Sequence, residues 1–294
     1  MTLKSQKYYD HHNDQPIDLD RDGCSLSNWH EQYGKAQFAR HPKGFLVFLS
    51  PDELEACDEY SVSDPYSVET NLDSEFHKRR IECTVELIKD AMQATQGMPR
   101  ILDLGCGQGH ITGRIREAYP NAEISALDYS VSAIEYAVDH FPQIAFDVAN
   151  VYKLPYASSY FDIVVCNNLW EHVPDPLSLL NTISKIIKPL GFLIISTPSR
   201  YRLENLIRVM RGKSVTFVSN LHVTEYSVGQ VFEQCRYGGY KVTRVLNKPL
   251  KLSRTKAKVA HMVFSWMIAL TGSHNQLEET IFYLAQRTGG LQKT

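Results

Sequence analysis

The sequence predicts an α/β fold in which a doubly wound, seven-stranded, mostly parallel sheet follows an N-terminal extension. Two observations predict this fold. Apolar strand-like runs alternate with helical segments after about residue 76, which is the pattern of parallel strands joined by crossover helices. The first run also leads directly into a glycine-rich loop at residues 105–109. Such a loop is where α/β folds bind a nucleotide-like cofactor, because glycine lets backbone N–H groups approach the ligand.

The strands and helices are expected in alternation along most of the chain. The predicted strands span residues 100–104, 123–127, 144–148, 161–166, 192–197, 240–245 and 280–285. The predicted helices span residues 74–95, 111–119, 132–140, 177–187 and 228–235. In the first helix Ser74 is the expected N-cap, and apolar residues then recur at spacings of three and four.

Residues 1–75 are polar and rich in turn residues, and only short apolar pieces such as Phe45–Leu49 can pack. We therefore expect an extension over residues 1–75 and an α/β domain over residues 76–294. Two segments exceed a minimal domain, 198–226 and 247–279. Because ligands bind beyond the carboxyl ends of parallel strands, we expect the extension and these two insertions to cover a substrate.

Composition and charge exclude several classes of protein. Hydrophobic residues make up 43% and charged residues 22% of the chain, as in globular domains. The net charge of −2 gives no cationic excess for nucleic acid. The longest apolar run, Val259–Leu270, is shorter than the roughly 20 residues of a membrane span, and the N-terminus lacks a signal peptide's apolar core. The six cysteines show neither C-x-x-C pairs nor the spacing of metal ligands, so we expect free thiols and a cytoplasmic protein.

The glycine loop differs from a dinucleotide-binding fingerprint, which has glycine or alanine where this chain has His110. A dehydrogenase is therefore disfavoured. The pattern here is instead Asp103-x-Gly105-x-Gly107-x-Gly109. This form resembles motif I of the class I S-adenosylmethionine (SAM)-dependent methyltransferases, whose fold is Rossmann-like.

Further elements of that family follow in order over residues 100–200. Asp128 ends the second strand, 23 residues after Gly105, where a carboxylate can accept hydrogen bonds from ribose hydroxyls. The alternative for Asp128 is a cap for the helix that begins near Ser132. The resemblance implies that Tyr129 lies against the adenine.

Three later segments also match the family. Asn150-Val-Tyr-Lys-Leu-Pro155 resembles its D-A-x-x-L-P element, which implies that Asn150 and Val151 contact the adenine; an Asn carbonyl can still accept the amino N–H. Asp162 matches the aspartate of the S-F-D-x-V element and is interpreted as structural. Lys188-Pro-Leu-Gly191 stands where the family usually has K-P-G-G.

The resemblance implies SAM as the cofactor and S-adenosyl-L-homocysteine as the product. Asp103 is expected near the methionine end, and Arg79 or Arg80 is a candidate for its carboxylate, because a guanidinium binds carboxylates in a fork. The alternative for the two arginines is a solvated basic turn. The residues expected to hold the cofactor are Asp103, Gly105, Cys106, Gly107, Gly109, Asp128, Tyr129, Asn150, Val151, Asn167 and Arg80.

A hydroxyl acceptor loses a proton when it is methylated, and histidine is the usual base near neutral pH. His172 follows the fourth predicted strand, and His222 lies in the segment L-H-V-T-E-Y; both surroundings resemble segments of small-molecule methyltransferases. We expect one of them to be the general base. The alternatives are a loop anchor for His172 and a cap for the helix near Ser227 for His222. Three other histidines are interpreted as packing or surface residues: His110, His140 and His261.

The motifs of amino-methylating nucleic-acid enzymes and of pyrimidine C5 methylation are absent, which favours a small organic acceptor. Trp170, Tyr201 and Tyr66 are expected to line its pocket, with ordinary packing as the alternative for each. No carboxylate pair or metal-ligand spacing accompanies the histidines, so no metal is expected. N- or C-methylation and a non-catalytic SAM-binding subunit stay open as alternatives to O-methylation.

Residues 251–270 form a basic stretch that leads into an apolar helix. Because apolar residues occupy nearly all sides of that helix, the pattern favours burial, as a lid or at a homodimer contact, over weak contact with a membrane surface.

Overall fold

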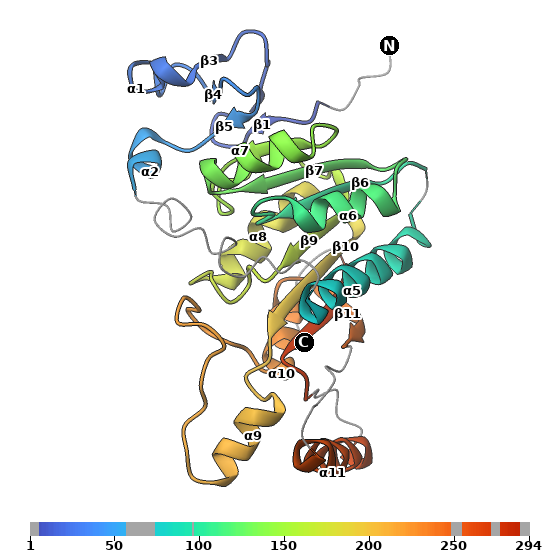
Figure 1. The fold of residues 1–294 in the computed structure, drawn as a ribbon. Helices are drawn as coiled ribbons and strands as arrows, with labels where there is room; N and C mark the ends of the chain where they lie inside the picture. Colours follow the sequence, from blue (N-terminus) through green and yellow to red (C-terminus); the bar gives the residue numbers. More distant parts are fainter. Residues whose placement is uncertain (1–5, 57–73, 96, 248–254, 272–276, 289–294) are drawn as a thin grey trace.

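The computed structural model describes residues 6–56, 74–95, 97–247, 255–271 and 277–288. Its centre is a ten-stranded sheet in the order β11-β12-β10-β9-β6-β7-β8-β5-β4-β3 (Figure 1). The strands of this sheet are β3 (Gly23–Ser25), β4 (Phe38–Arg40), β5 (Leu46–Val47), β6 (Arg100–Leu104), β7 (Glu123–Asp128), β8 (Ala145–Val148), β9 (Phe161–Asn167), β10 (Ile187–Pro198), β11 (Tyr240–Leu246) and β12 (Thr280–Arg287). A separate ribbon pairs β1 (Tyr9–Asp10) with β2 (Gln15–Pro16).

All seven predicted strands belong to this sheet, but the predicted count was wrong. Three short strands of the N-terminal extension, β3, β4 and β5, continue the sheet beyond β8, and β5 pairs with β8 in parallel. The buried side chains of Leu46 and Val47 anchor β5 at this side of the sheet. Each of the three strands is too short to show the two-residue alternation of side chains by which a strand is recognised in a sequence.

Strands β10, β9, β6, β7 and β8 run parallel, and β12 runs antiparallel between β10 and β11. The carboxyl ends of β6, β7 and β9 therefore meet at one edge of the sheet, which is where α/β folds bind ligands. Asp162 aligns the opposite ends of these strands. It accepts hydrogen bonds from the backbone N–H of Arg100 (2.9 Å) and from Nζ of Lys188 (2.7 Å), which confirms its structural role.

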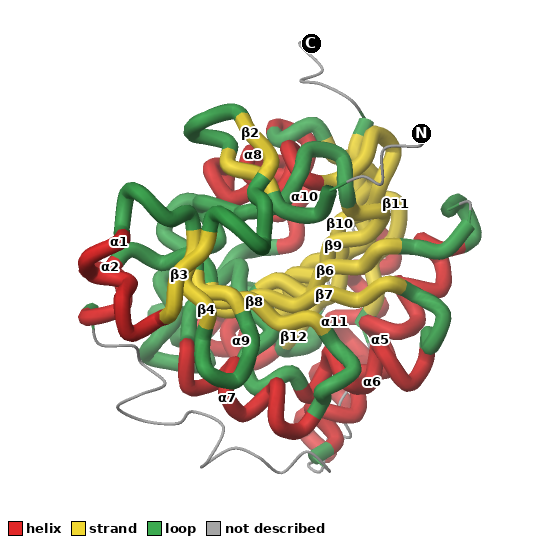
Figure 2. Tube along the Cα trace, turned by 90° about the horizontal axis from the view of Figure 1, so that it is seen from above, coloured by secondary structure: helices red, strands yellow, loops and turns green. Residues whose placement is uncertain are grey.

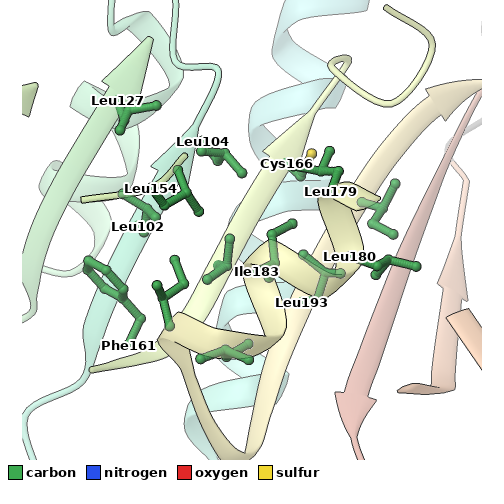
Figure 3. Close-up of a cluster of buried hydrophobic side chains, with 14 of the residues drawn as sticks. Leu102, Leu104, Leu127, Leu154, Phe161, Cys166, Leu179, Leu180, Ile183 and Leu193 are labelled. Carbon is green, nitrogen blue, oxygen red and sulfur yellow. The ribbon is translucent and has the colours of Figure 1, made fainter. Parts of the chain in front are cut away.

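Helices cover both faces of the sheet, so each face has its own apolar core (Figure 2). One face carries α5 (Glu75–Met92), α6 (His110–Ala118) and α7 (Val131–His140); the other carries α8 (Pro176–Ile186) and α10 (Val228–Tyr237). Figure 3 shows how α8 directs Leu179, Leu180 and Ile183 toward the buried side chains of the strands. The extension adds the short helices α1 (Trp29–Gln32) and α2 (Pro51–Glu55) and the 3-10 turn η1 (Leu26–Asn28).

Each predicted insertion contains one helix, α9 (Leu203–Met210) or α11 (Thr255–Thr271), and both lie at the end of the molecule opposite the extension (Figure 1). The expected burial of the second helix as a lid was wrong. On α11 the side chains of Met262, Trp266 and Leu270 are 65%, 64% and 67% exposed. Among the described residues, no helix combines the length and apolarity needed to cross a bilayer.

Candidate active site

The glycine loop is held in a backbone conformation that favours glycine. Gly105, Gly107 and Gly109 have φ angles of 75°, 53° and 78°. The N–H groups of Gly105 and Cys106 both donate to the carbonyl oxygen of Leu127, at 2.8 and 3.1 Å, and tie the loop to β7. A Cβ on Gly105 would lie 3.1 Å from the side chain of Leu169, so a larger residue there would have to displace that side chain and also adopt a positive φ.

Asp128 joins the end of β7 to this loop. Its Oδ2 accepts a hydrogen bond from the N–H of Gly107 (2.7 Å), and its Oδ1 accepts one from the N–H of Ser130 (3.0 Å). Helix α7 is capped by Ser130, whose Oγ accepts from the N–H of Ala133 (3.1 Å), so the interpretation of Asp128 as the cap is wrong. A carboxylate in this position only accepts hydrogen bonds, which is the chemistry that ligand hydroxyls need.

A small pocket opens above the loop. Its lining residues are His77, Arg80, Asp103, Gly105, Cys106, Gln108, His110, Ile111 and Asn167. Five of these were predicted to hold the cofactor. His110 was interpreted as a packing residue, and its ring does pack against Tyr136 with centroids 5.5 Å apart, but it also lines the pocket. His77, Gln108 and Ile111 were missed, although each lies within three residues of a predicted one.

Two opposite charges face each other across this pocket. Asp103 is buried and accepts a hydrogen bond from Oγ1 of Thr112 (2.6 Å); burial raises the pKa of its carboxyl to about 6, while that hydrogen bond and the charge of Arg80 act against the rise. Arg80 lies in the first turns of α5, and its buried Nε has no hydrogen-bond partner within the described residues. Because Arg79 is also buried, the interpretation as a solvated turn is wrong. A carboxylate and a guanidinium in one pocket match the ammonium and carboxylate of an amino acid.

The extension contacts the residues expected at the adenine. Nδ2 of Asn150 donates to Oε1 of Glu53 in α2 (3.0 Å), and the Tyr129 hydroxyl donates to the backbone oxygen of Glu53 (3.1 Å). Oδ1 of Asn150 accepts from the N–H of Tyr152 (3.0 Å) and keeps a second lone pair. Val151, between them in sequence, is half-buried. Nothing in the sequence near Glu53 indicated this contact.

His172 and His222 lie together although 50 residues separate them in the chain. Their rings meet edge to face with centroids 5.0 Å apart. Nδ1 of His222 lies 3.0 Å from Oε1 of Glu225, a fully buried carboxylate that is also paired with Arg202. Helix α10 is capped by Ser227 together with Gln230, so the interpretation of His222 as its cap is wrong.

Glu171 completes this group. It is fully buried, burial raises the pKa of its carboxyl, and its ligand atom lies within 4.8 Å of those of His172 and His222. Three such side chains can hold a metal ion. This cluster was not visible in the sequence, because His222 comes from the first insertion.

The aromatic residues expected at the acceptor are dispersed. Trp170 is fully buried, and its Nε1 donates to Oε1 of Gln234 in α10 (2.9 Å), so the structure assigns it to the core instead of to an acceptor pocket. Tyr201 is 43% exposed at the start of the first insertion. Tyr66 lies outside the described residues.

The fold and this site define a Rossmann-like protein with a glycine loop and a small polar pocket at the carboxyl ends of its central strands. A family model described as a methyltransferase domain matches residues 96–249, and the chain belongs to that family. Residues 96–249 therefore form a methyltransferase domain.

Curated relatives match part of the chain. The malonyl-[acyl-carrier protein] O-methyltransferase of Hahella chejuensis is 34% identical over 120 residues, which cover 40% of this chain and 43% of the relative. A ubiquinone biosynthesis O-methyltransferase from Alkalilimnicola ehrlichii is 36% identical over 116 residues, which cover 38% of this chain and 46% of the relative. The chain thus spans about half the length of the curated relatives it matches.

Solved structures share the fold at low identity. The plantazolicin methyltransferase BpumL, in complex with a desmethylPZN analogue and SAH, has a TM-score of 0.55 at 14% identity, covering 78% of this chain and 93% of its own. A SAM-dependent methyltransferase from Aquifex aeolicus has a TM-score of 0.51 at 14% identity, covering 75% of this chain and 97% of its own.

Proposed function

We propose that the chain transfers the methyl group of SAM to a hydroxyl oxygen of a small organic molecule. The observation that carries this proposal is the cluster of Glu171, His172 and His222, which is built on the loop that follows β9. The loop that holds His172 starts at Asn167, which lines the pocket, and Leu169 of the same loop packs over Gly105. The two curated relatives reported above are O-methyltransferases by name, which supports oxygen as the acceptor atom.

In this proposal, different residues in and around the pocket bind different parts of SAM. Asp128 would accept hydrogen bonds from the ribose, Tyr129, Asn150 and Val151 would contact the adenine, and Arg80 with Asp103 would bind the amino-acid end. The glycine loop brings backbone close to the ligand, and Asn167 closes the pocket toward β9. SAM supplies an electrophilic methyl group on a sulfonium.

His172 or His222 would act as the base in this proposal. As the acceptor oxygen forms its bond to the methyl carbon, the carbon–sulfur bond breaks, and the hydroxyl proton passes to the imidazole. Glu225 accepts the Nδ1 proton of His222, so Nε2 is free to receive the new one. This geometry supports His222 as the base and His172 as its partner at the acceptor.

The test is methylation of a panel of hydroxylated, amino and carbon acids with labelled SAM, using His172→Ala and His222→Ala separately and His140→Ala as the control. A loss of at least about 100-fold in kcat for a hydroxyl substrate in one of the two variants supports the proposal. If both variants lose only a few-fold, oxygen methylation through a histidine base is wrong. If S-adenosyl-L-homocysteine binds and no acceptor turns over, the chain is a non-catalytic SAM-binding subunit.

We also propose that the end of the molecule formed by α9 and α11 contacts an anionic membrane surface. Residues 203–213, in and after α9, contain three Lys and Arg against one Glu, and residues 248–258, which lead into α11, contain five Lys and Arg and no Asp or Glu. Exposed apolar side chains gather in the same region, with Val209 and Met210 on α9 and Met262, Trp266 and Leu270 on α11. Cations flanking an apolar helix face are typical of helices that lie in the bilayer interface.

Sedimentation with vesicles of phosphatidylcholine, with and without phosphatidylserine, tests this contact. We expect binding that needs the anionic lipid, weakens at high salt, and is lost in Trp266→Ser combined with Met262→Ser. A concentration-dependent dimer that the same pair of changes disrupts, with no vesicle binding, would identify the face as a contact between two copies.

A further inference from the structure

The cluster of Glu171, His172 and His222 has the composition of a metal site. One ligand atom from each residue lies within 4.8 Å of the others. Two ligands bound to one transition-metal ion, each at about 2.0–2.2 Å, lie about 3–4 Å apart, so small side-chain rotations close the site. Two imidazoles and one carboxylate also leave coordination positions open, as catalytic zinc sites do.

Glu171 is a buried carboxylate with weak support for one of its oxygens. Its Oε1 accepts a hydrogen bond from Nδ2 of Asn168 (3.0 Å). Within the described residues its Oε2 has no partner in good hydrogen-bond geometry, and the neutral hydroxyl of Thr197 is the side-chain donor near the carboxylate besides Asn168. Asn168 is itself held in place, because its N–H donates to the backbone oxygen of Ser196 (2.9 Å). A buried carboxylate supported by neutral donors is costly, and a cation bound there would offset that cost.

Glu225 prepares His222 as a ligand. Its fully buried carboxylate can only accept hydrogen bonds, so Nδ1 of His222 carries the proton and Nε2 keeps its lone pair. Arg202 holds the other oxygen of Glu225. A carboxylate behind the far nitrogen of a histidine is the usual support of a metal-bound imidazole.

We propose that Glu171, His172 and His222 bind a divalent transition-metal ion of the Zn²⁺ type at the acceptor end of the pocket. Nitrogen ligands favour such an ion over Mg²⁺ or Ca²⁺, which prefer oxygen. The inference rests on the proposed function in one respect: the open position would hold the acceptor hydroxyl. A bound ion would lower the pKa of that hydroxyl and water would take its proton, so this inference keeps the proposed hydroxyl methylation but replaces the histidine base proposed above by a metal ion that the histidines hold.

The binding test uses the full chain without a polyhistidine tag, stripped with a chelator, and does not depend on turnover. Zn²⁺ is titrated against a chromophoric chelator, and Co²⁺ is added to record its visible absorption. We expect one equivalent of Zn²⁺ and a Co²⁺ spectrum of low coordination number. Glu171→Gln, His172→Asn and His222→Asn should each weaken Zn²⁺ binding by at least about 100-fold, and Glu225→Gln by about 10-fold.

His140→Asn, on the exposed surface of α7, is the matched control and should leave binding unchanged. Binding of S-adenosyl-L-homocysteine by each variant checks that it is folded; if Glu171→Gln fails, the two histidine variants decide. No Zn²⁺ binding, or binding equal in the three variants and the control, overturns the metal site. Hydroxyl methylation that a chelator does not slow, without Zn²⁺ binding, would overturn only this inference; Zn²⁺ binding without hydroxyl methylation would overturn only the proposed function.

Discussion

The carboxylate of Asp128 accepts a hydrogen bond from the backbone N–H of Gly107 at 2.7 Å. This contact links the tip of β7 to the middle of the glycine loop that follows β6, so the side chain that we propose for the ribose also shapes the loop. The buried position of Asp128 makes the contact strong, because water does not compete for it.

Asp128→Asn should therefore weaken cofactor binding. The amide has one acceptor oxygen instead of two and no charge, so it cannot serve Gly107, Ser130 and a ribose together. We expect the Kd of S-adenosyl-L-homocysteine to rise by about 10- to 100-fold in calorimetric titration. Asp139→Asn, on the exposed end of α7, is the control and should bind like the wild type. An unchanged Kd in Asp128→Asn would contradict the assignment of Asp128 to the ribose.

Asp103 should make stability depend on pH. Its carboxyl has a pKa of about 6 in the folded state, above the ordinary value of 3.8, so the folded state holds a proton that the unfolded state releases. The carboxyl's contribution to stability is present below about pH 4 and is lost as the pH rises through about 6, by about 3 kcal/mol in total.

Thermal unfolding of the wild type and of Asp103→Asn between pH 4 and 8 measures this effect. The wild type should lose stability relative to the variant as the pH rises from 4 to 6, and the difference should then level off. Adding S-adenosyl-L-homocysteine should reduce the difference, because its ammonium group favours the ionised carboxylate. A difference that is constant over the whole range would show that Asp103 is ionised throughout.

Trp170→Phe distinguishes a core residue from an acceptor contact. The change removes the hydrogen bond from the indole N–H to Oε1 of Gln234 and leaves a small cavity. We therefore expect the free energy of unfolding to fall by about 2 kcal/mol. KM for the acceptor should not change, because the ring is fully buried. A rise of KM for the acceptor with little loss of stability would instead show that Trp170 contacts the acceptor.

Leu190→Gly should stabilise the protein by up to about 1 kcal/mol. Leu190 lies in the irregular part of β10 between Ile187 and Phe192, and its φ is 64°. The side chain is 65% exposed, so removing it costs little burial. Denaturant unfolding measures the change, and Leu177→Gly at the exposed start of α8, where the backbone is helical, should instead destabilise.

Much of the fold could be predicted from short stretches of sequence, because the residue pattern of each core strand or loop reflects how that segment is buried. The sequences of β6 and β9 are mostly apolar because both faces of each strand are buried. The glycine loop was recognisable as a motif because Gly105 and Gly109 adopt positive φ angles that favour glycine. The strands of the extension could not be predicted in this way. For example, β5 consists only of Leu46 and Val47, and it forms a strand because it pairs with β8, a distant segment of the chain.

The sequence by itself determined the α/β alternation, the glycine loop and Asp128 as the end of the neighbouring strand, because these depend on residues close together in the chain. Only the tertiary structure decided which distant residues meet: His222 lies against His172, Glu225 orients it, and Glu171 is buried beside both. It also decided that Trp170 packs in the core and that α11 exposes its apolar face. These outcomes depend on contacts between distant segments, and burial is a property of the assembled fold that no local pattern contains.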